Sequence, residues 1–506
     1  MLELISFICG FSVMVFEISG IRILTPFIGS TFITSTTIIG ILLFALSIGY
    51  YFGGKWADKS LKSEKLGIII LISATYIALS AVCQFKLLKY ITYNVQTSIY
   101  IKSIISSLAL FFIPSLLLGA VSPYITKLAI SNTNFSNQKT GELIGKFYAI
   151  STIGSIIGTF LSGFVLIIYF GIDKIFLFLS STLSLASFLC FFTGKNFTSK
   201  QKMFYYFIIL ALNFFSFFLY NSFFKFPVSI LNGTIYSKTT PYSYLTVVNN
   251  ENNLYLRADI YGYHTVVNRN EKITQNSFDF EDYNNIFKEI YLEKFQNNRI
   301  LILGNGAGKL SNWILQRNKN LKKERKILDI IEIDKEVINI AKKYFGMTTE
   351  NANIFYEDAR TYVNNSQKVK KDYYDIIYSD LYISGFISPF YLMTKEFFSD
   401  IYNLTSENGI LCINVIGSTQ GIYKDYLEQF YTQINSVYSD TKVYAFSPSK
   451  YISNYIIIGF KNPTSQESLK LKKALKSIEY NNINLKNQIY TNMYAPVEKF
   501  YVPKSF

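Results

Sequence analysis

The first 224 residues consist largely of long apolar runs, which exceed what one soluble domain needs and indicate a membrane domain. Seven runs each supply the roughly 20 residues that a membrane-spanning helix requires. They extend over Leu2 to Phe27, Ile33 to Phe52, Leu66 to Cys83, Ile104 to Ala129, Phe147 to Phe170, Ile175 to Phe192 and Phe204 to Phe224. We therefore predict a polytopic membrane domain over residues 1–225 with about seven spans.

The first run is longer than a cleaved signal peptide and lacks a basic start, so we expect it to remain in the membrane. The sequence also contains glycines at GxxxG spacing, Gly154 and Gly158, which predict close approach of another helix. Glu17 and Arg22 lie inside the first run, about 140° apart on a helix, and we interpret them as packing against other helices.

Lysines are concentrated in the loops after the second, fourth and sixth runs, for example Lys59, Lys127 and Lys200. Positively charged loops favour the cytoplasmic side, which predicts a multi-pass protein of the cell (inner) membrane with a cytoplasmic N-terminus. If all seven runs cross, the C-terminal domain lies outside. If the seventh run lies in the membrane interface, or if the first run does not fully cross, the C-terminal domain lies inside. The sequence leaves both arrangements open.

Several classes of function are disfavoured by composition. The net charge of +15 comes from lysines in loops between apolar runs and in solvated segments, so we do not predict nucleic-acid binding. The single histidine, His264, gives little basis for a Ser-His-Asp site. Metal and disulfide sites are disfavoured because the four cysteines have apolar surroundings and no CxxC spacing: Cys9, Cys83, Cys190 and Cys412.

The second half of the chain carries four short segments in the order of a nucleoside-binding α/β domain. They are ILILGNGAGK from Ile300, ILDIIEID from Ile327, FYEDAR from Phe355 and YYDIIYSD from Tyr373. The first segment reads as a strand, a tight turn and the start of a helix. Its glycines, Gly304, Gly306 and Gly308, would let backbone amides approach a ligand at the helix N-terminus.

Alternating strand and helix patterns continue through this half of the chain. They predict an α/β Rossmann-type, methyltransferase-like domain over residues 299–506. Before it, residues 226–298 combine a linker with short alternating strands and Asn-rich turns. The predicted fold is a multi-span α-helical membrane domain followed by this α/β domain with a small N-terminal β appendage.

From Thr240 to Phe460 the chain resembles the spermidine synthases, the polyamine aminopropyltransferases. The resemblance is carried by LYLRADIYGYHTVV, EIDKEVINIAKKYF, EDAR and LMTKEFF. The run from FEISGIRILTPFIGS through GKWADKS resembles a membrane module fused to such domains. The resemblance implies no permanently bound cofactor, decarboxylated S-adenosylmethionine or a related adenosyl nucleoside as co-substrate, a small-molecule amine acceptor and a possible homodimer.

The resemblance also assigns roles to individual residues. It implies that Glu332 accepts the two ribose hydroxyls and that Asp358 accepts the adenine amino group. Each has a simpler alternative: Glu332 could be a surface carboxylate at a strand end, and Asp358 could cap the following helix. Gly304, Gly306 and Gly308 would shape the nucleoside loop.

On the acceptor side, Asp380 is the candidate base, and Tyr283 and Tyr382 would line the acceptor pocket. These tyrosines are equally consistent with core packing. Two positions depart from the family pattern, because Ala307 and Ile383 stand where relatives usually carry acidic residues. An amine must lose a proton before it attacks, so a site with fewer carboxylates is less suited to a polycation.

Three functions follow from these observations. The first is a membrane-tethered aminopropyltransferase or related transferase with an adenosyl sulfonium donor, of which methyl transfer is a variant. The second is a degenerate domain that binds a nucleoside or polyamine without turnover, which Ala307 and Ile383 favour. The third is a transporter-like protein with a regulatory soluble domain, since YYFGGKWADKS and LLLGAVSPYITK resemble helix ends of major-facilitator-type transporters.

Overall fold

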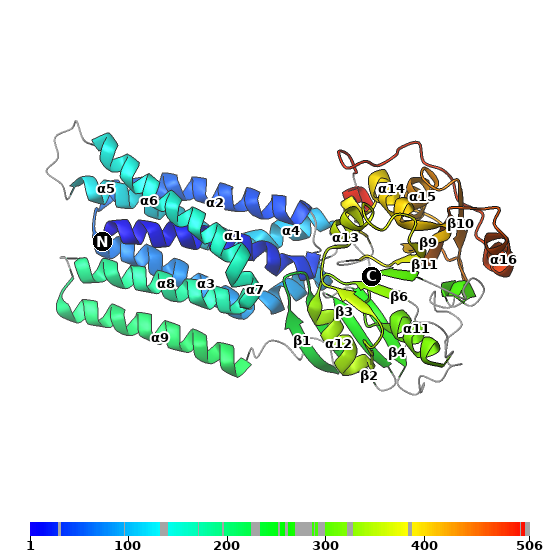
Figure 1. Cartoon of the computed structure of the whole chain (residues 1–506). Helices are drawn as coiled ribbons and strands as arrows, with labels where there is room; N and C mark the ends of the chain where they lie inside the picture. Colours follow the sequence, from blue (N-terminus) through cyan, green and yellow to red (C-terminus); the bar gives the residue numbers. More distant parts are fainter. Residues whose placement is uncertain are drawn as a thin grey trace. The chain divides into compact units, whose positions relative to one another are not determined.

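A computed structural model gives the fold as two compact units, Met1–Pro227 and Val228–Val502, here called unit 1 and unit 2. Unit 1 is helical and unit 2 combines strands with helices (Figure 1). The structure describes all residues except 29–31, 96, 132–139, 171, 195–196, 224–232, 251–252, 259–261, 269–285, 288, 292–298, 321–326, 383–386, 496 and 501–506.

Unit 1 is a bundle of long helices (Figure 1). Two of the apolar stretches contain a short π-helical segment, which joins flanking α-helices without a loop. The elements are α1 (Leu2–Ile28), α2 (Phe32–Lys59), α3 (Ser63–Asn94), α4 (Ile99–Ser107), η1 (Leu108–Phe112), α5 (Ile113–Ser131), α6 (Thr140–Leu161), η3 (Ser162–Leu166), α7 (Ile167–Tyr169), α8 (Ile172–Thr193) and α9 (Ser199–Phe223).

Within the described residues, six helical stretches are long and apolar enough to cross a membrane. They are Leu2–Thr25, Ile33–Lys59, Ser63–Gln84, Tyr100–Ser131, Thr140–Leu166 and Lys174–Thr193, and they overlap the first six runs predicted from the sequence. The seventh run lies in α9, where many side chains fall outside the described residues. A seventh span therefore stays a prediction.

Glycines bring neighbouring helices of unit 1 into backbone contact. A Cβ added at Gly154 or Gly158 of α6 would overlap the backbone of α1 at Phe7 and Phe11. In the same way, a Cβ added at Gly53 of α2 would overlap the backbone of Ala120 in α5. The prediction that the GxxxG spacing permits close helix approach is confirmed, and the partner is another helix of the same chain.

Unit 2 begins with a four-stranded antiparallel sheet of order β1-β2-β3-β4. Its strands are β1 (Thr234–Thr239), β2 (Tyr244–Asn250), β3 (Asn253–Ala258) and β4 (Gly262–Asn268). Apolar residues of β2 and β3 pack against α12 through Val337 and Ile340. This sheet is the predicted β appendage, and its core contact is with the helix that follows Glu332.

A seven-stranded sheet forms the centre of unit 2, with the order β10-β11-β9-β8-β5-β6-β7. Strands β9, β8, β5, β6 and β7 run parallel, and β11 pairs antiparallel with β9 and β10. The strands are β5 (Arg299–Leu303), β6 (Ile327–Ile331), β7 (Asn353–Phe355), β8 (Tyr374–Ser379), β9 (Thr405–Gly417), β10 (Asp440–Tyr444) and β11 (Ser453–Phe460).

Both faces of the central sheet are covered by helices because its strands are apolar on both sides. Leu301 and Leu303 face a core with α13, α14 and α15, whereas Ile300 and Ile302 face a core with α11 and α12. The helices are α11 (Lys309–Asn320), α12 (Lys335–Phe345), α13 (Ala359–Ser366), α14 (Lys395–Leu404), α15 (Ile422–Asn435) and α16 (Gln466–Ala474), with 3-10 turns η4 (Phe390–Leu392), η5 (Lys476–Ile478) and η6 (Val497–Phe500). The predicted doubly wound α/β fold is confirmed.

The strand order reverses at β5, which pairs with β6 on one side and with β8 on the other. In open α/β sheets, ligands bind beyond the carboxyl ends of the strands at such a reversal. The residues after these strands continue the ladder: Gly304 N donates to Ile331 O at 2.9 Å and Asp380 N donates to Leu303 O at 2.9 Å. The fold therefore places the predicted glycine loop and Asp380 at adjacent strand ends.

Candidate functional site

The glycine loop is a tight turn between β5 and α11. Gly304, Gly306 and Gly308 have φ values of +83°, +51° and +76°. A Cβ at Gly304 would overlap the carbonyl oxygen of Asp380, so this position requires glycine for both conformation and space. The turn leads into the first residues of α11, where free backbone amides can approach an anion or a polar ligand.

Asn305 stabilises the loop from within. Its side-chain oxygen accepts a hydrogen bond from Ser311 Oγ at 2.7 Å, and its carbonyl oxygen accepts one from Gly308 N at 3.0 Å. Its own backbone N–H donates to Glu332 Oε2 at 3.1 Å. The glycine loop and the predicted ribose-binding carboxylate are thus held together directly.

Glu332 follows β6, and its side chain is held at both oxygens. Oε2 accepts from Asn305 N, and Oε1 accepts from Asp334 N at 3.1 Å. The residue is only 9% exposed, so it is not the solvated surface carboxylate of the alternative interpretation. Each carboxylate oxygen has further acceptor capacity, which suits it to a pair of hydroxyl donors.

Burial raises the pKa of Glu332 from 4.5 to about 7, while the amides of Asp334 and Asn305 act in the opposite direction. Its folded pKa exceeds that of an unfolded glutamate, so its stabilising contribution is present below about pH 4.5 and is lost as the pH rises through about 7. We expect the melting temperature of the ligand-free protein to fall between about pH 5 and pH 8, and Glu332→Gln to remove part of that fall. An unchanged pH dependence in Glu332→Gln would contradict this prediction.

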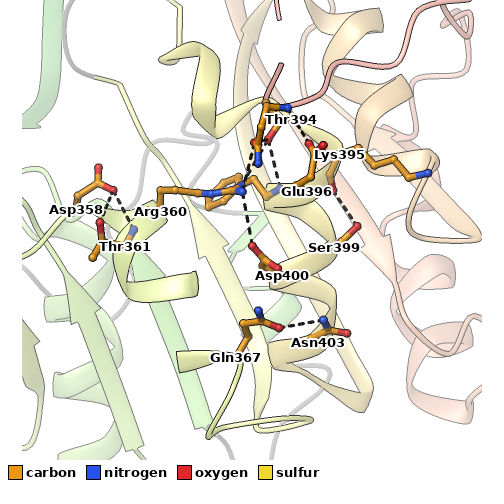
Figure 2. A network of polar contacts seen from close by, with 12 residues as sticks. Asp358, Arg360, Thr361, Gln367, Thr394, Lys395, Glu396, Ser399, Asp400 and Asn403 are labelled. Carbon is orange, nitrogen blue, oxygen red and sulfur yellow. Dashed lines mark hydrogen bonds and ion pairs between the residues drawn. The ribbon is translucent and has the colours of Figure 1, made fainter. Parts of the chain in front are cut away.

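Asp358 lies just after β7 and caps α13. Its Oδ1 accepts from Thr361 N at 3.0 Å, while Tyr391 OH lies 3.4 Å from Oδ2 (Figure 2 shows the cap). The alternative interpretation of Asp358 as a helix cap is therefore confirmed. The cap engages Oδ1 and the Tyr391 hydroxyl donates to Oδ2, so recognition of an adenine amino group through Oδ2 stays a prediction.

Arg360 connects the start of α13 to α14 and to the C-terminal segment (Figure 2). Its guanidinium lies 3.7 Å from Asp400 Oδ2, 3.5 Å from Thr394 Oγ1 and 3.4 Å from Asn492 Oδ1. Asn492 N in turn donates to Glu396 Oε2 at 3.0 Å. These contacts fix α13, the helix that Asp358 caps and that follows the edge strand β7.

Asp380 lies at the end of β8 and is held by a residue that the sequence did not single out. Asn414 Nδ2, on β9, donates to Asp380 Oδ1 at 3.0 Å. Asn414 is 4% exposed, and its Oδ1 has no hydrogen-bond partner among the described residues. A single amide inside the apolar run ILCINVIG was the signal that could have identified it, because buried polar groups normally have partners.

The tyrosine predictions have different outcomes. The Tyr382 hydroxyl donates to Asn414 O at 3.1 Å and accepts from Ile416 N at 3.0 Å, so it fastens the segment after β8 to β9. Burial raises the pKa of this hydroxyl well above 10. Contact of the Tyr382 ring with the amine substrate stays a prediction. Tyr283 and Ile383 lie outside the described residues.

Ala307 is 2% exposed and packs in the apolar cluster formed by β2, β3 and α12. Residues of that cluster include Leu245, Val247 and Val337. At this position the glycine loop contributes an apolar contact to the appendage and supplies no charge. The acidic residues among the predicted site positions are therefore Glu332, Asp358 and Asp380.

Comparison with known proteins identifies the family to which this region belongs. Residues 284–472 match the model of the spermine/spermidine synthase domain. This region belongs to the spermine/spermidine synthase family. The matched region contains Glu332, Asp358, Asp380 and the glycine loop, which are the positions to which the resemblance assigns roles.

Relatives of this spermine/spermidine synthase domain include two proteins named polyamine aminopropyltransferase. One, from Clostridium botulinum (strain Eklund 17B, type B), is 29% identical over 200 residues, covering 38% of this chain and 64% of the relative. The other, from Clostridium botulinum (strain Alaska E43, type E3), is 30% identical over 171 residues, covering 32% of this chain and 55% of the relative. The chain thus spans less than two thirds of either relative.

Among solved structures, the spermidine synthase from Thermotoga maritima is similar over 52% of this chain and 82% of its own, at 18% identity and a TM-score of 0.37. The site roles of the individual residues rest on the local geometry described above. In that geometry, the glycine loop contacts Glu332, and Asp380 contacts Asn414.

Proposed function

We propose that unit 2 is an aminopropyltransferase-type transferase that uses an adenosyl sulfonium donor and is tethered to a membrane by unit 1. The observation that carries this proposal is the position of Glu332, held between the glycine-loop amide of Asn305 and the amide of Asp334 at the strand-order reversal. The family of residues 284–472 and the names of the relatives support the same reaction class.

In this mechanism the ribose hydroxyls of the adenosyl substrate donate to Glu332, and the adenine amino group donates to Asp358 Oδ2, the oxygen that the helix cap does not engage. The sulfonium then lies beyond the glycine loop, near the end of β8. An acceptor amine attacks the carbon next to sulfur, so that a carbon–nitrogen bond forms as the carbon–sulfur bond breaks. The thioether leaves as methylthioadenosine, and the amine proton passes to Asp380.

Asn414 would orient this step. Its Nδ2 donates to Asp380 Oδ1 and so fixes this carboxylate against β9, and its own buried Oδ1 has no hydrogen-bond partner among the described residues. We expect the Asp380 carboxylate and the Asn414 amide together to align the attacking amino group. Ala307 adds no charge there, so we expect weaker binding of highly charged substrates than a site with more carboxylates would give.

The proposal is tested by turnover of the full-length protein in detergent micelles. Decarboxylated adenosylmethionine and a diamine such as putrescine should yield methylthioadenosine and the aminopropylated amine, both measured by mass spectrometry. S-Adenosylmethionine serves as the alternative donor, and its turnover would favour methyl transfer. Saturable binding of methylthioadenosine without product from either donor would overturn the proposed activity and favour the degenerate domain.

Membrane sidedness follows from the same proposal. An adenosyl sulfonium donor made in the cytoplasm requires unit 2 on the cytoplasmic side, and thus an even number of crossings if the N-terminus is also cytoplasmic. The six qualifying helices satisfy this condition if α9 does not cross. We expect Thr464→Cys to resist a membrane-impermeant maleimide in intact cells and to react after lysis, as should Lys59→Cys at the C-terminal end of α2. Labelling of Thr464→Cys in intact cells would contradict the assignment.

A further inference from the structure

We propose that strand β1 positions the nucleoside-binding carboxylate, with Thr240 acting on Glu332 through Asp334. This inference rests on the proposed function. Its basis is a row of side chains at alternate positions along β1 and just beyond it: Tyr236, Lys238 and Thr240. Alternate residues of a strand lie on one face, so the three share a face, and all three contact the segment that follows Glu332.

Two of these side chains hold Glu336, in the first turn of α12. Tyr236 OH donates to Glu336 Oε1 at 2.6 Å, and Lys238 Nζ donates to Glu336 Oε2 at 2.6 Å. Lys238 also forms an ion pair with this carboxylate, and together these donors lower its pKa against the effect of burial. β1 is thereby fixed beside the N-terminal turn of α12, and Figure 1 shows β1 next to this helix.

Thr240 makes the contact nearest to the site. Its hydroxyl donates to Asp334 Oδ2 at 2.5 Å and accepts hydrogen bonds from Tyr242 N at 3.2 Å and Ser243 N at 3.1 Å. Thr240 is 4% exposed and Asp334 is 5% exposed. A hydroxyl with three such partners is fixed in orientation, so the turn between β1 and β2 determines where the Asp334 side chain lies.

Asp334 passes this constraint to Glu332. Its Oδ1 accepts from Glu336 N at 2.9 Å and caps α12, while its backbone N–H donates to Glu332 Oε1 at 3.1 Å. One residue thus joins the turn after β1, the start of α12 and the ribose carboxylate. Thr240 is a positioning residue: it does not touch the donor, and it acts by orienting the amide that orients Glu332.

The test compares Thr240→Val, which removes the hydroxyl, with Thr240→Ser, which keeps it, in the full-length protein in detergent. Ser237→Ala is the matched control, since Ser237 lies on the opposite face of β1. We expect Thr240→Val to raise the Kd of methylthioadenosine about tenfold, consistent with one lost hydrogen bond to a charged group. Thr240→Ser and Ser237→Ala should remain within about twofold of the wild type.

Two further readouts separate positioning from general stability. At saturating donor, kcat of Thr240→Val should change less than about threefold, because the lost contact affects donor binding. Amide hydrogen exchange of the ligand-free protein should rise in peptides covering residues 331–337 and stay unchanged in peptides from β9. Faster exchange throughout unit 2, or an unchanged Kd and exchange rate in Thr240→Val, would overturn the inference.

The exchange measurement also separates this inference from the proposed function. If the wild-type protein binds no methylthioadenosine, the proposed function fails, and the local effect of Thr240 on residues 331–337 is still decided by exchange. If the wild type binds methylthioadenosine and Thr240→Val binds it equally well, the proposed function stands and the positioning role is overturned.

Discussion

Replacing Glu332 by alanine is expected to weaken binding of methylthioadenosine by about 100-fold to 1,000-fold. The carboxylate is proposed to accept two ribose hydroxyls, and hydrogen bonds to a charged group contribute about 1.5–3 kcal/mol each. Losing both corresponds to about 3–6 kcal/mol, and the lower part of that range gives the expected loss at about 1.4 kcal/mol for each tenfold change in Kd. Isothermal titration of the full-length protein in detergent measures this effect directly.

The same substitution also removes the acceptor for two backbone amides. Asn305 N and Asp334 N both donate to Glu332, so alanine at position 332 would leave a loop amide and a helix-cap amide without their partner. Glu332→Gln retains the volume and one acceptor oxygen and should give an intermediate Kd. Glu467→Ala, at an exposed carboxylate in the first turn of α16, is the matched control and should leave binding unchanged.

Binding of methylthioadenosine by Glu332→Ala with wild-type affinity would remove the central element of the proposed site. The nucleoside would then have to be held by the glycine loop and Asp358 alone. An effect confined to Glu332→Ala, with Glu332→Gln like the wild type, would show that the acceptor geometry matters more than the charge.

The sequence predicted the elements of the site better than its internal contacts. Apolar strands followed by glycine or a carboxylate predicted Gly304, Glu332 and Asp380 at adjacent strand ends, because parallel strands place their carboxyl ends at one edge. The partners of these residues depend on three-dimensional proximity. Asn305 and Glu332 are far apart in the chain, and no periodicity indicates that an amide of one meets a carboxylate of the other.

Asn414 and Thr240 were missed for related reasons. Asn414 lies in a strand that reads as wholly apolar, and its importance depends on the register that pairs β9 with β8. Thr240 lies in a turn, where a threonine is ordinarily explained by local hydrogen bonds. Asp358 illustrates the opposite case, since its helix cap follows from local sequence and was anticipated as the alternative to ligand binding.

In unit 1, hydropathy predicted the long helices but not how they pack or where π-helical segments occur. The glycine at position 154 indicated a close helix contact, and the structure supplies α1 as the partner. The two π-helical segments, Leu108–Phe112 and Ser162–Leu166, have no comparable signal in the composition. Helix pairing in a bundle depends on side-chain fit between distant segments, which a single apolar run does not encode.

Asp380→Asn is expected to lower kcat by about 100-fold to 10,000-fold, the range for loss of a general base. Binding of methylthioadenosine should change less than about threefold, because Asp380 is assigned to the acceptor side of the site. Asparagine keeps the size of the side chain and can still contact Asn414. Asp425→Asn, at a half-exposed carboxylate paired with Lys486, is the matched control and should retain full activity.

The pH–rate profile distinguishes loss of a base from loss of geometry. Without Asp380, the acceptor must deprotonate in solution, and an alkyl amine has a pKa of about 10. The rate of Asp380→Asn should therefore rise about tenfold per pH unit up to that range, and the wild-type profile should be flatter. An equally steep profile in both proteins, or full activity in Asp380→Asn, would show that another group removes the proton.

Asn414→Ala should give a smaller loss of kcat than Asp380→Asn, because it removes the Asn414 hydrogen bond to Asp380 while leaving the base in place.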